Sequence, residues 1–286
     1  MPAPCAVGMT RRLCLQRLGA WRLDTSDHQR CRRALSQWAI DPLPRVSLPV
    51  VGDSTARFPV NRIFCVGRNY SEHATEMRKR EAGFGVTGDE REPPFFFLKA
   101  SDCAVSHPSA EAEPAAALRI PFPPATSDLH FEAEMVVALG SGGRDIETAD
   151  ALGHVYGYAI GLDLTRRDIQ DLAKQQRRPW TAAKSFAAAA PCSAVVPAST
   201  LASGHPTEGR IWLSLDGTLQ QDSNIKQLTW NVPEVIAALS SLFTLEPGDL
   251  IMTGTPAGVG AVAPGQRLKV GLEALGAPLS LTVDVY

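Results

Sequence analysis

The sequence lacks the features that mark several large classes of protein. Its apolar stretches all fall short of the roughly 20 residues that span a membrane. A net charge of −2 leaves no basic excess for nucleic acid, and no Gly-x-Gly-x-x-Gly or Walker sequence offers a phosphate-binding loop. The six cysteines show no Cys-x-x-Cys spacing, which indicates free thiols in a reducing compartment. We therefore expect neither a membrane nor a nucleic acid as a partner.

What is present is an ordinary globular composition, with 44% hydrophobic and 20% charged residues among 286. We divide the chain into an N-terminal appendage and linker, residues 1–60, and a catalytic domain, residues 61–286. Four arginines precede the first acid, Asp24, which fits either a mitochondrial presequence or a short packed extension. The expected location is the cytoplasm, or the mitochondrial matrix if the source is eukaryotic.

Alternating and apolar segments predict a strand-rich α+β fold with mostly antiparallel strands. Helices are expected from Ser71, from Thr165 as a cap, and over residues 232–242. The expected strands are residues 62–66, 95–99, 130–139, 154–164, 209–215, 218–221, 268–270 and 279–285.

The strand expected at residues 130–139 carries two acids. Because side chains alternate along a strand, Glu132 and Glu134 should point the same way, about 6–7 Å apart. Two carboxylates this close in an apolar interior repel each other and need a positive partner. The alternative is a solvent-facing strand whose two glutamates are simply hydrated.

A third acid, Asp163, ends the apolar run at residues 154–164. Three carboxylates without histidine or cysteine nearby form an oxygen-only ligand set, which suits Mg²⁺, Mn²⁺ or Ca²⁺ and argues against zinc. Three acids and one divalent cation would leave a net negative site with open coordination positions. Such a site can polarise a substrate carbonyl.

A possible general base lies on the helix expected from Ser71. His73 and Glu76 are three residues apart and can touch on one face of that helix. A carboxylate beside an imidazole raises its basicity, although a plain surface contact has the same spacing. The charged segment at residues 78–92 follows, either as an active-site lid or as a solvated insertion.

The segment after Asp163 offers further polar groups. Arg167 and Gln170 are three residues apart and share a helix face. Lys184, in a neighbourhood of small residues, is either a surface lysine or a cation that points into the site.

Residues 63–77, 129–139, 161–186 and 245–260 together resemble the fumarylacetoacetate hydrolase family, and within it the fumarylpyruvate and acylpyruvate hydrolases. The resemblance covers about residues 60–286 in the right order. It implies a mixed β-sandwich roll with flanking helices, and commonly a homodimer. One departure is Lys99-Ala100, where relatives usually have Lys-Pro.

The resemblance also implies roles for individual residues. The implied metal ligands are Glu132, Glu134 and Asp163; the implied catalytic residues are His73, Glu76 and Lys184; and the implied substrate-binding residues are Arg68, Arg167, Gln170 and Thr255.

The implied activity is Mg²⁺-dependent hydrolysis, with Mn²⁺ or Ca²⁺ possible, of a carbon–carbon bond in a 2,4-dioxo acid such as fumarylpyruvate. The alternatives are decarboxylation or tautomerisation of oxaloacetate, isomerisation or hydration of another 2-oxo acid, and a non-catalytic metal-binding relative.

Overall fold

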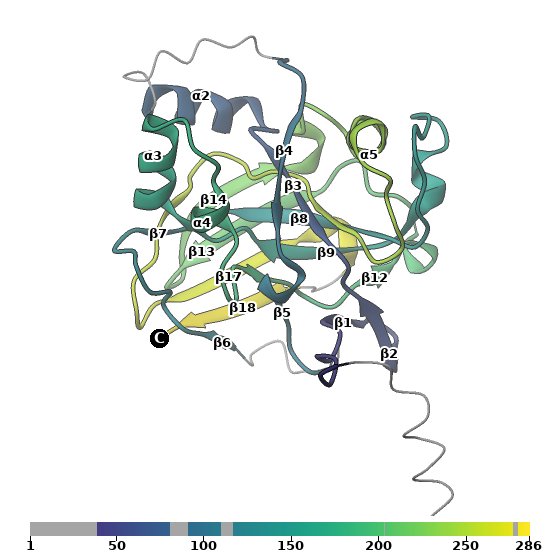
Figure 1. Ribbon diagram of the computed structural model, residues 1–286, viewed down its shortest axis with the longest axis horizontal. Helices are drawn as coiled ribbons and strands as arrows, with labels where there is room; N and C mark the ends of the chain where they lie inside the picture. The colour runs from purple at the N-terminus through teal and green to yellow at the C-terminus, as the bar shows by residue number, and fades with distance from the viewer. Residues whose placement is uncertain (1–38, 81–90, 110–116, 203, 277–279) are drawn as a thin grey trace, which may run out of the picture. The chain divides into compact units, whose positions relative to one another are not determined.

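The computed structural model describes residues 39–80, 91–109, 117–202, 204–276 and 280–286 (Figure 1). The chain divides into two compact units, Met1–Pro44 and Arg45–Tyr286, and the second contains the sheets and helices of the fold. Among the described residues, no helix is long and apolar enough to cross a membrane. The possible presequence lies outside the described residues, as does most of the predicted loop at residues 78–92.

A six-stranded sheet forms one side of the core. Its order is β12 (Val196–Pro197), β9 (Val155–Leu162), β8 (Ala133–Leu139), β15 (Leu250–Met252), β3 (Ile63–Gly67) and β4 (Phe95–Lys99). Only the β15–β3 pair is parallel. Strand β8 is buried along its whole length, which explains its continuous apolar sequence after Glu134.

A five-stranded sheet packs against the first through β13, β17 and β18. Its order is β14 (Thr218–Asn224), β13 (Arg210–Leu215), β17 (Arg267–Leu272), β18 (Ser280–Val285) and β6 (Leu118–Ile120). The turn between β13 and β14 has φ of 49° at Asp216 and 82° at Gly217, as a two-residue hairpin requires. Apolar side chains between the two sheets form the core. The predicted strand-rich α+β sandwich is confirmed.

Residues 45–60 pack with this unit. Strands β1 (Ser47–Val50) and β2 (Asp53–Pro59) form a hairpin, and Leu48 and Phe58 are part of the buried core. The Val51 amide also donates to the Val195 carbonyl at 2.9 Å. The compact unit therefore begins at Arg45, whereas the functional division at residue 60 stays a prediction.

The described part of the chain also has α-helices. They are α2 (Ser71–Arg80), α3 (Arg167–Gln175), α4 (Thr181–Lys184) and α5 (Val232–Leu242), with short 3₁₀ segments η2 (Ser101–Cys103), η3 (Ala151–His154), η4 (Ala198–Thr200), η5 (Ile225–Gln227) and η6 (Glu273–Leu275). Of these helices, α2, α3 and α5 lie around the outside of the strands in Figure 1. Helix α5 has its predicted bounds because Asn231 and Glu234 form a capping box. The predicted cap at Thr165 is wrong, since this residue is in strand β10 (Thr165–Arg166) and α3 begins at Arg167.

The predicted continuous strand at residues 130–139 is also wrong, because the chain leaves one sheet and enters another at Glu132. Strand β7 (Leu129–Phe131) pairs with β10 and β16 (Gly260–Ala261), whereas β8 pairs with β9 and β15. At the break, the Glu132 carbonyl accepts from the Asp163 amide at 2.9 Å. The remaining two-stranded sheet joins β11 (Ala190–Pro191) to β5 (Ala104–Val105).

Candidate active site

Three carboxylates meet where β8 and β9 approach the break at Glu132. Glu132 occupies the break, Glu134 is the second residue of β8, and Asp163 directly follows β9. Each is at most 5% exposed, and each offers an oxygen within 4.8 Å of the others. The structure thus brings the three predicted ligands together in the interior, which excludes the alternative of hydrated surface glutamates.

Three buried cations accompany these acids. Arg167 Nη2 donates to Glu132 Oε1. Lys184 Nζ lies 2.7 Å from both Glu132 Oε2 and Asp163 Oδ2. Lys99 Nζ lies 2.8 Å from Asp163 Oδ1. The expectation of a net negative site is therefore wrong. Three cations balance the three acids even when all three acids are ionised, and a bound divalent ion would leave an excess of positive charge that suits an anionic substrate.

Lys99 is the cation that sequence reasoning left out of the site. It ends β4 and donates to the carbonyls of Leu164, at 3.0 Å, and Lys184. These contacts join β4 to the residue after Asp163 and to the end of α4. The available signal was a lysine that closes the apolar run Phe-Phe-Phe-Leu, because a buried lysine needs a negative partner.

The buried acids differ in how readily they ionise. Burial opposes ionisation of Glu132, yet Lys184 and Arg167 lower its pKa well below the usual range. Burial raises the pKa of Glu134, and repulsion by Asp163 and Glu132 raises it further. Glu134 is therefore the carboxylate most in need of additional positive charge.

The oxygen atoms of the cluster fit an oxygen-preferring divalent cation. Asp163 Oδ1 lies near Lys99 Nζ but accepts no aligned hydrogen bond from a described residue. Glu134 Oε2 accepts from the Gly254 amide at 2.7 Å. Buried carboxylate oxygens with unused lone pairs are the ligands that Mg²⁺ and Mn²⁺ prefer.

The Thr-Gly-Thr-Pro segment after β15 supports this cluster. Gly254 has φ of 98°, and a Cβ at this position would lie 2.7 Å from Asn69 Cβ, so only glycine places its amide against Glu134. Thr255 is buried, and its Oγ1 accepts from Gln221 Nε2 at 2.8 Å. Gln221 lies in β14 of the five-stranded sheet, and the sequence did not indicate it as part of the site.

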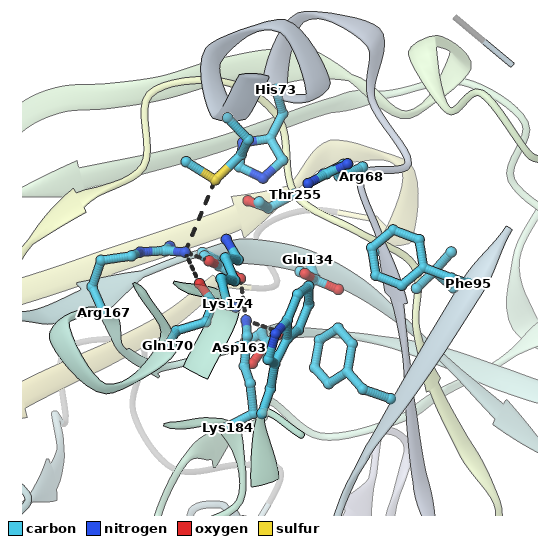
Figure 2. Close-up of a pocket in the computed structure, with 16 residues that line it drawn as sticks. Arg68, His73, Phe95, Glu134, Asp163, Arg167, Gln170, Lys174, Lys184 and Thr255 are labelled. Carbon is cyan, nitrogen blue, oxygen red and sulfur yellow. Dashed lines mark hydrogen bonds and ion pairs between the residues drawn. The ribbon is translucent and has the colours of Figure 1, made fainter. Parts of the chain in front are cut away.

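The predicted histidine–glutamate pair forms on α2. His73 Nδ1 lies 3.3 Å from Glu76 Oε2, which also accepts from the Gly258 amide at 3.3 Å. Burial opposes ionisation of Glu76, but its hydrogen bond with His73 lowers its pKa overall. His73 is buried and lines the same pocket as the three carboxylates (Figure 2).

The other predicted site residues line this pocket too. Arg167 Nη1 donates to Gln170 Oε1 at 2.5 Å, so the two residues share a face of α3 as expected. Arg68 lies across the pocket from α3 (Figure 2), at the end of β3, with φ of 54°. Lys184 points inward and is not a surface lysine. The aromatic part of the wall consists of Phe95, Phe97 and Trp180.

Oxygen ligands for a divalent cation beside a histidine–carboxylate pair are typical of a metal-dependent enzyme rather than of a scaffold protein. The model of the fumarylacetoacetate (FAA) hydrolase C-terminal family matches residues 62–283. The chain belongs to this family.

Individual members of the family are similar over most of the chain. The crystal structure of fumarylpyruvate hydrolase from Pseudomonas aeruginosa, in complex with Mn²⁺ and pyruvate, is 43% identical with a TM-score of 0.77 and covers 87% of this chain and 99% of that one. A fumarylpyruvate hydrolase from Ralstonia sp is 41% identical over 67% of this chain and 93% of the relative. A mitochondrial oxaloacetate decarboxylase from Dictyostelium discoideum is 38% identical over 75% of this chain and 89% of the relative.

Proposed function

We propose that the chain is a Mg²⁺-dependent hydrolase that cleaves a carbon–carbon bond in a 2,4-dioxo acid such as fumarylpyruvate, releasing fumarate and pyruvate. The observation that carries this proposal is that His73, with Glu76 beside it, opens onto the same pocket as the carboxylates Glu132, Glu134 and Asp163. The two similar fumarylpyruvate hydrolases support it.

The three carboxylates would hold the metal. When bound, a divalent cation supplies positive charge against the oxygens of a 2-oxo acid and stabilises the enolate that leaves on cleavage. Mn²⁺ in the Pseudomonas structure supports a divalent ion, and Mg²⁺ is our choice because all three ligands are carboxylates.

The dyad would supply the attacking group. His73 accepts a proton from water, and Glu76 Oε2, at 3.3 Å from Nδ1, holds the imidazole and stabilises its positive form. The resulting hydroxide adds to the ketone carbon distal to the 2-oxo acid group. The bond from that carbon to the methylene then breaks, and its electron pair passes to the departing pyruvate enolate, which takes up a proton.

Two residues would stabilise the oxyanion that forms during this addition. Lys184 Nζ has three protons, and its contacts with Glu132 and Asp163 use two of them. Gln170 accepts from Arg167 through its carbonyl oxygen, which presents its amide nitrogen as a donor. A donor aimed at a developing oxyanion commonly contributes about 10²–10³ in kcat. Arg68, Arg167 and Thr255 would hold the substrate's polar groups.

A second candidate is decarboxylation or tautomerisation of oxaloacetate, favoured by the similarity to the Dictyostelium decarboxylase. Oxaloacetate offers the same 2-oxo acid end to the carboxylate cluster. Decarboxylation needs no attacking water, so His73 would have a lesser role in it. We further propose a homodimer, in the cytoplasm or, if the source is eukaryotic, in the mitochondrial matrix.

The test is a panel of substrates with purified protein and Mg²⁺. Fumarylpyruvate, acetylpyruvate, fumarylacetoacetate and oxaloacetate are supplied separately, and the products are identified by chromatography. We expect fumarate and pyruvate from fumarylpyruvate, and no reaction after chelation of the metal. Turnover of oxaloacetate alone would replace the main proposal by the second.

A further inference from the structure

Asn69 is a buried polar residue between the end of β3 and the start of α2, and the proposed reaction gives it no role. Its side-chain Nδ2 donates to the carbonyl of Trp230 at 2.9 Å and to the carbonyl of Thr253 at 2.8 Å. Its Oδ1 accepts from the Trp230 amide at 2.8 Å. Both protons on Nδ2 are thus in use. Turning the carboxamide over would place its NH₂ against an N–H and its oxygen against two carbonyls, so these contacts fix its orientation.

One of these contacts reaches the carboxylate cluster through a single peptide group. The carbonyl of Thr253 and the amide of Gly254 belong to the same peptide group, in which C=O and N–H point in opposite directions. The carbonyl accepts from Asn69 on one side, and the amide donates to Glu134 Oε2 at 2.7 Å on the other. Asn69 and Glu134 therefore hold the two ends of one planar group.

The backbone on either side leaves the tilt of this peptide group to be set by those two contacts. Before it, the amide and Oγ1 of Thr253 donate to the Met135 carbonyl at 3.1 and 3.0 Å, which anchors Thr253 to β8. After it, Gly254 has φ of 98° and no side chain to restrict its backbone. The peptide plane can turn about the ψ angle of Thr253 and the φ angle of Gly254, and the hydrogen bond from Asn69 opposes that rotation.

We propose that Asn69 is a positioning residue for metal binding, because it orients the peptide group that holds the carboxylate of Glu134. The inference rests on the proposed function in one respect, namely that Glu134 is a ligand of the divalent metal. Donation by Asn69 to the carbonyl also polarises the peptide group and strengthens its amide as a donor. Residues that orient a metal ligand in this way typically contribute about 10-fold or more to metal affinity.

The first test measures Mn²⁺ binding to the full-length protein from the electron paramagnetic resonance signal of the free ion. Asn69→Ala should weaken binding about 10-fold. Asn61→Ala is the matched control, because it removes another asparagine side chain whose Nδ2 donates to Asp249 Oδ1 at 2.9 Å. This control should bind Mn²⁺ with the affinity of the wild type.

A double-mutant cycle with Glu134→Gln separates positioning from a general loss of structure. If Asn69 acts through Glu134, Asn69→Ala should change the Mn²⁺ affinity about 2-fold or less once Glu134 is replaced. The same fold-loss in both backgrounds would overturn the inference. Wild-type affinity in Asn69→Ala, or a wild type that binds no Mn²⁺, would also overturn it.

Hydrogen exchange in the wild type tests the same peptide group without any variant. The Gly254 amide should exchange about 100-fold or more slowly than the amide of Gly217, which lies in the exposed turn between β13 and β14. Equal exchange at the two glycines would contradict the role of Asn69.

Cleavage of fumarylpyruvate is measured on the same samples to separate this inference from the proposed function. A protein that shows the expected coupling between Asn69 and Glu134 but cleaves no acylpyruvate would contradict the proposed function while supporting the positioning role. A protein that cleaves fumarylpyruvate, but loses Mn²⁺ affinity equally in both backgrounds of the cycle, would do the reverse.

Discussion

At the scale of single residues, the site is a compact set of opposite charges. Glu132 is held ionised by Lys184 and Arg167, while Glu134 forms no ion pair with any described residue and has a raised pKa. An isolated charge of this kind is costly in a protein interior. Because the two glutamates differ in their ionisation, we expect substitutions of the carboxylates to have different effects on stability and metal binding, although all three carboxylates are buried.

Glu134→Gln should therefore abolish activity and weaken divalent binding by about 10-fold or more, on the scale of a lost charged contact in the interior. The fold should persist, because glutamine can still accept from the Gly254 amide and has no charge for Asp163 and Glu132 to repel. Calorimetric titration with Mg²⁺ measures the affinity. Glu147→Gln, at an exposed position, is the matched control. Unchanged affinity in Glu134→Gln would remove this residue from the site.

His73→Ala should lower kcat for fumarylpyruvate by about 10²–10⁴-fold, the usual contribution of a general base. Mg²⁺ affinity should be retained, because the carboxylates do not depend on His73 for their contacts. Steady-state kinetics and Mg²⁺ titration provide the two measurements. Glu72→Gln changes an exposed acid on the same helix and should have little effect.

The rate of oxaloacetate decarboxylation is a second measurement on the His73→Ala variant. Because this reaction uses no attacking water, its rate should fall less in His73→Ala than the rate of fumarylpyruvate cleavage. If fumarylpyruvate is cleaved at nearly the wild-type rate, another residue is the base.

At the scale of the elements, the active site depends on a contact between the two sheets. Gln221 lies in β14 of the five-stranded sheet, yet its side chain accepts from the Ala133 amide at 3.0 Å, just beyond the break at Glu132. Its amide nitrogen donates to Thr255 Oγ1 and to the Pro256 carbonyl, each at 2.8 Å. Gln221 thus provides the hydrogen-bond acceptor for the backbone amide just after the break, and its amide nitrogen holds the Thr-Gly-Thr-Pro segment in place.

Gln221→Leu should lower the free energy of unfolding by about 2–4 kcal/mol, since it leaves buried polar groups without partners at about 1–3 kcal/mol each. It should also raise the KM for fumarylpyruvate, because Thr255, a proposed substrate-binding residue, loses the donor that orients its hydroxyl. Chemical denaturation and steady-state kinetics measure these effects. Gln220→Leu changes the exposed neighbour on the same strand and should cost less than 1 kcal/mol, or roughly the effect of a surface substitution. Equal losses in both variants would contradict the proposed link.

At the scale of the whole molecule, metal binding and folding should be linked. The carboxylates come from segments that only the folded chain brings within 4.8 Å, so a metal binds the native state in preference to the unfolded one. Glu134 must lose its proton to bind the metal. Because its pKa is raised by burial, this loss requires a higher pH than for an exposed glutamate.

Mg²⁺ at about 100 times its dissociation constant should therefore add about 2.7 kcal/mol to the free energy of unfolding. For a domain of this size, that corresponds to a rise in Tm of about 5–10 °C. The rise should be small at low pH and grow as the pH increases, because metal binding releases the proton of Glu134. Scanning calorimetry over a series of pH values, with Glu134→Gln as the metal-binding control, tests this. A shift that is independent of pH would contradict the linkage.

The sequence by itself determined the local features. Alternation and apolar runs predicted most strands, and the helix expected over residues 232–242 has the bounds of α5. Three-residue spacing placed His73 beside Glu76 and Arg167 beside Gln170, because such pairs meet on any helix. The oxygen-only set of acids indicated a divalent cation without knowledge of the fold.

Only the tertiary structure decided which distant groups complete the site. Lys99 meets Asp163, and Gln221 meets Ala133 across 88 residues of sequence, so no local pattern could reveal either contact. The break at Glu132 depends on competing strand partners in two sheets. The net negative charge expected for the site was wrong for the same reason. The acids were visible in the sequence, whereas their counter-ions were paired with them by long-range packing in a medium of low polarity, where each buried charge requires a partner.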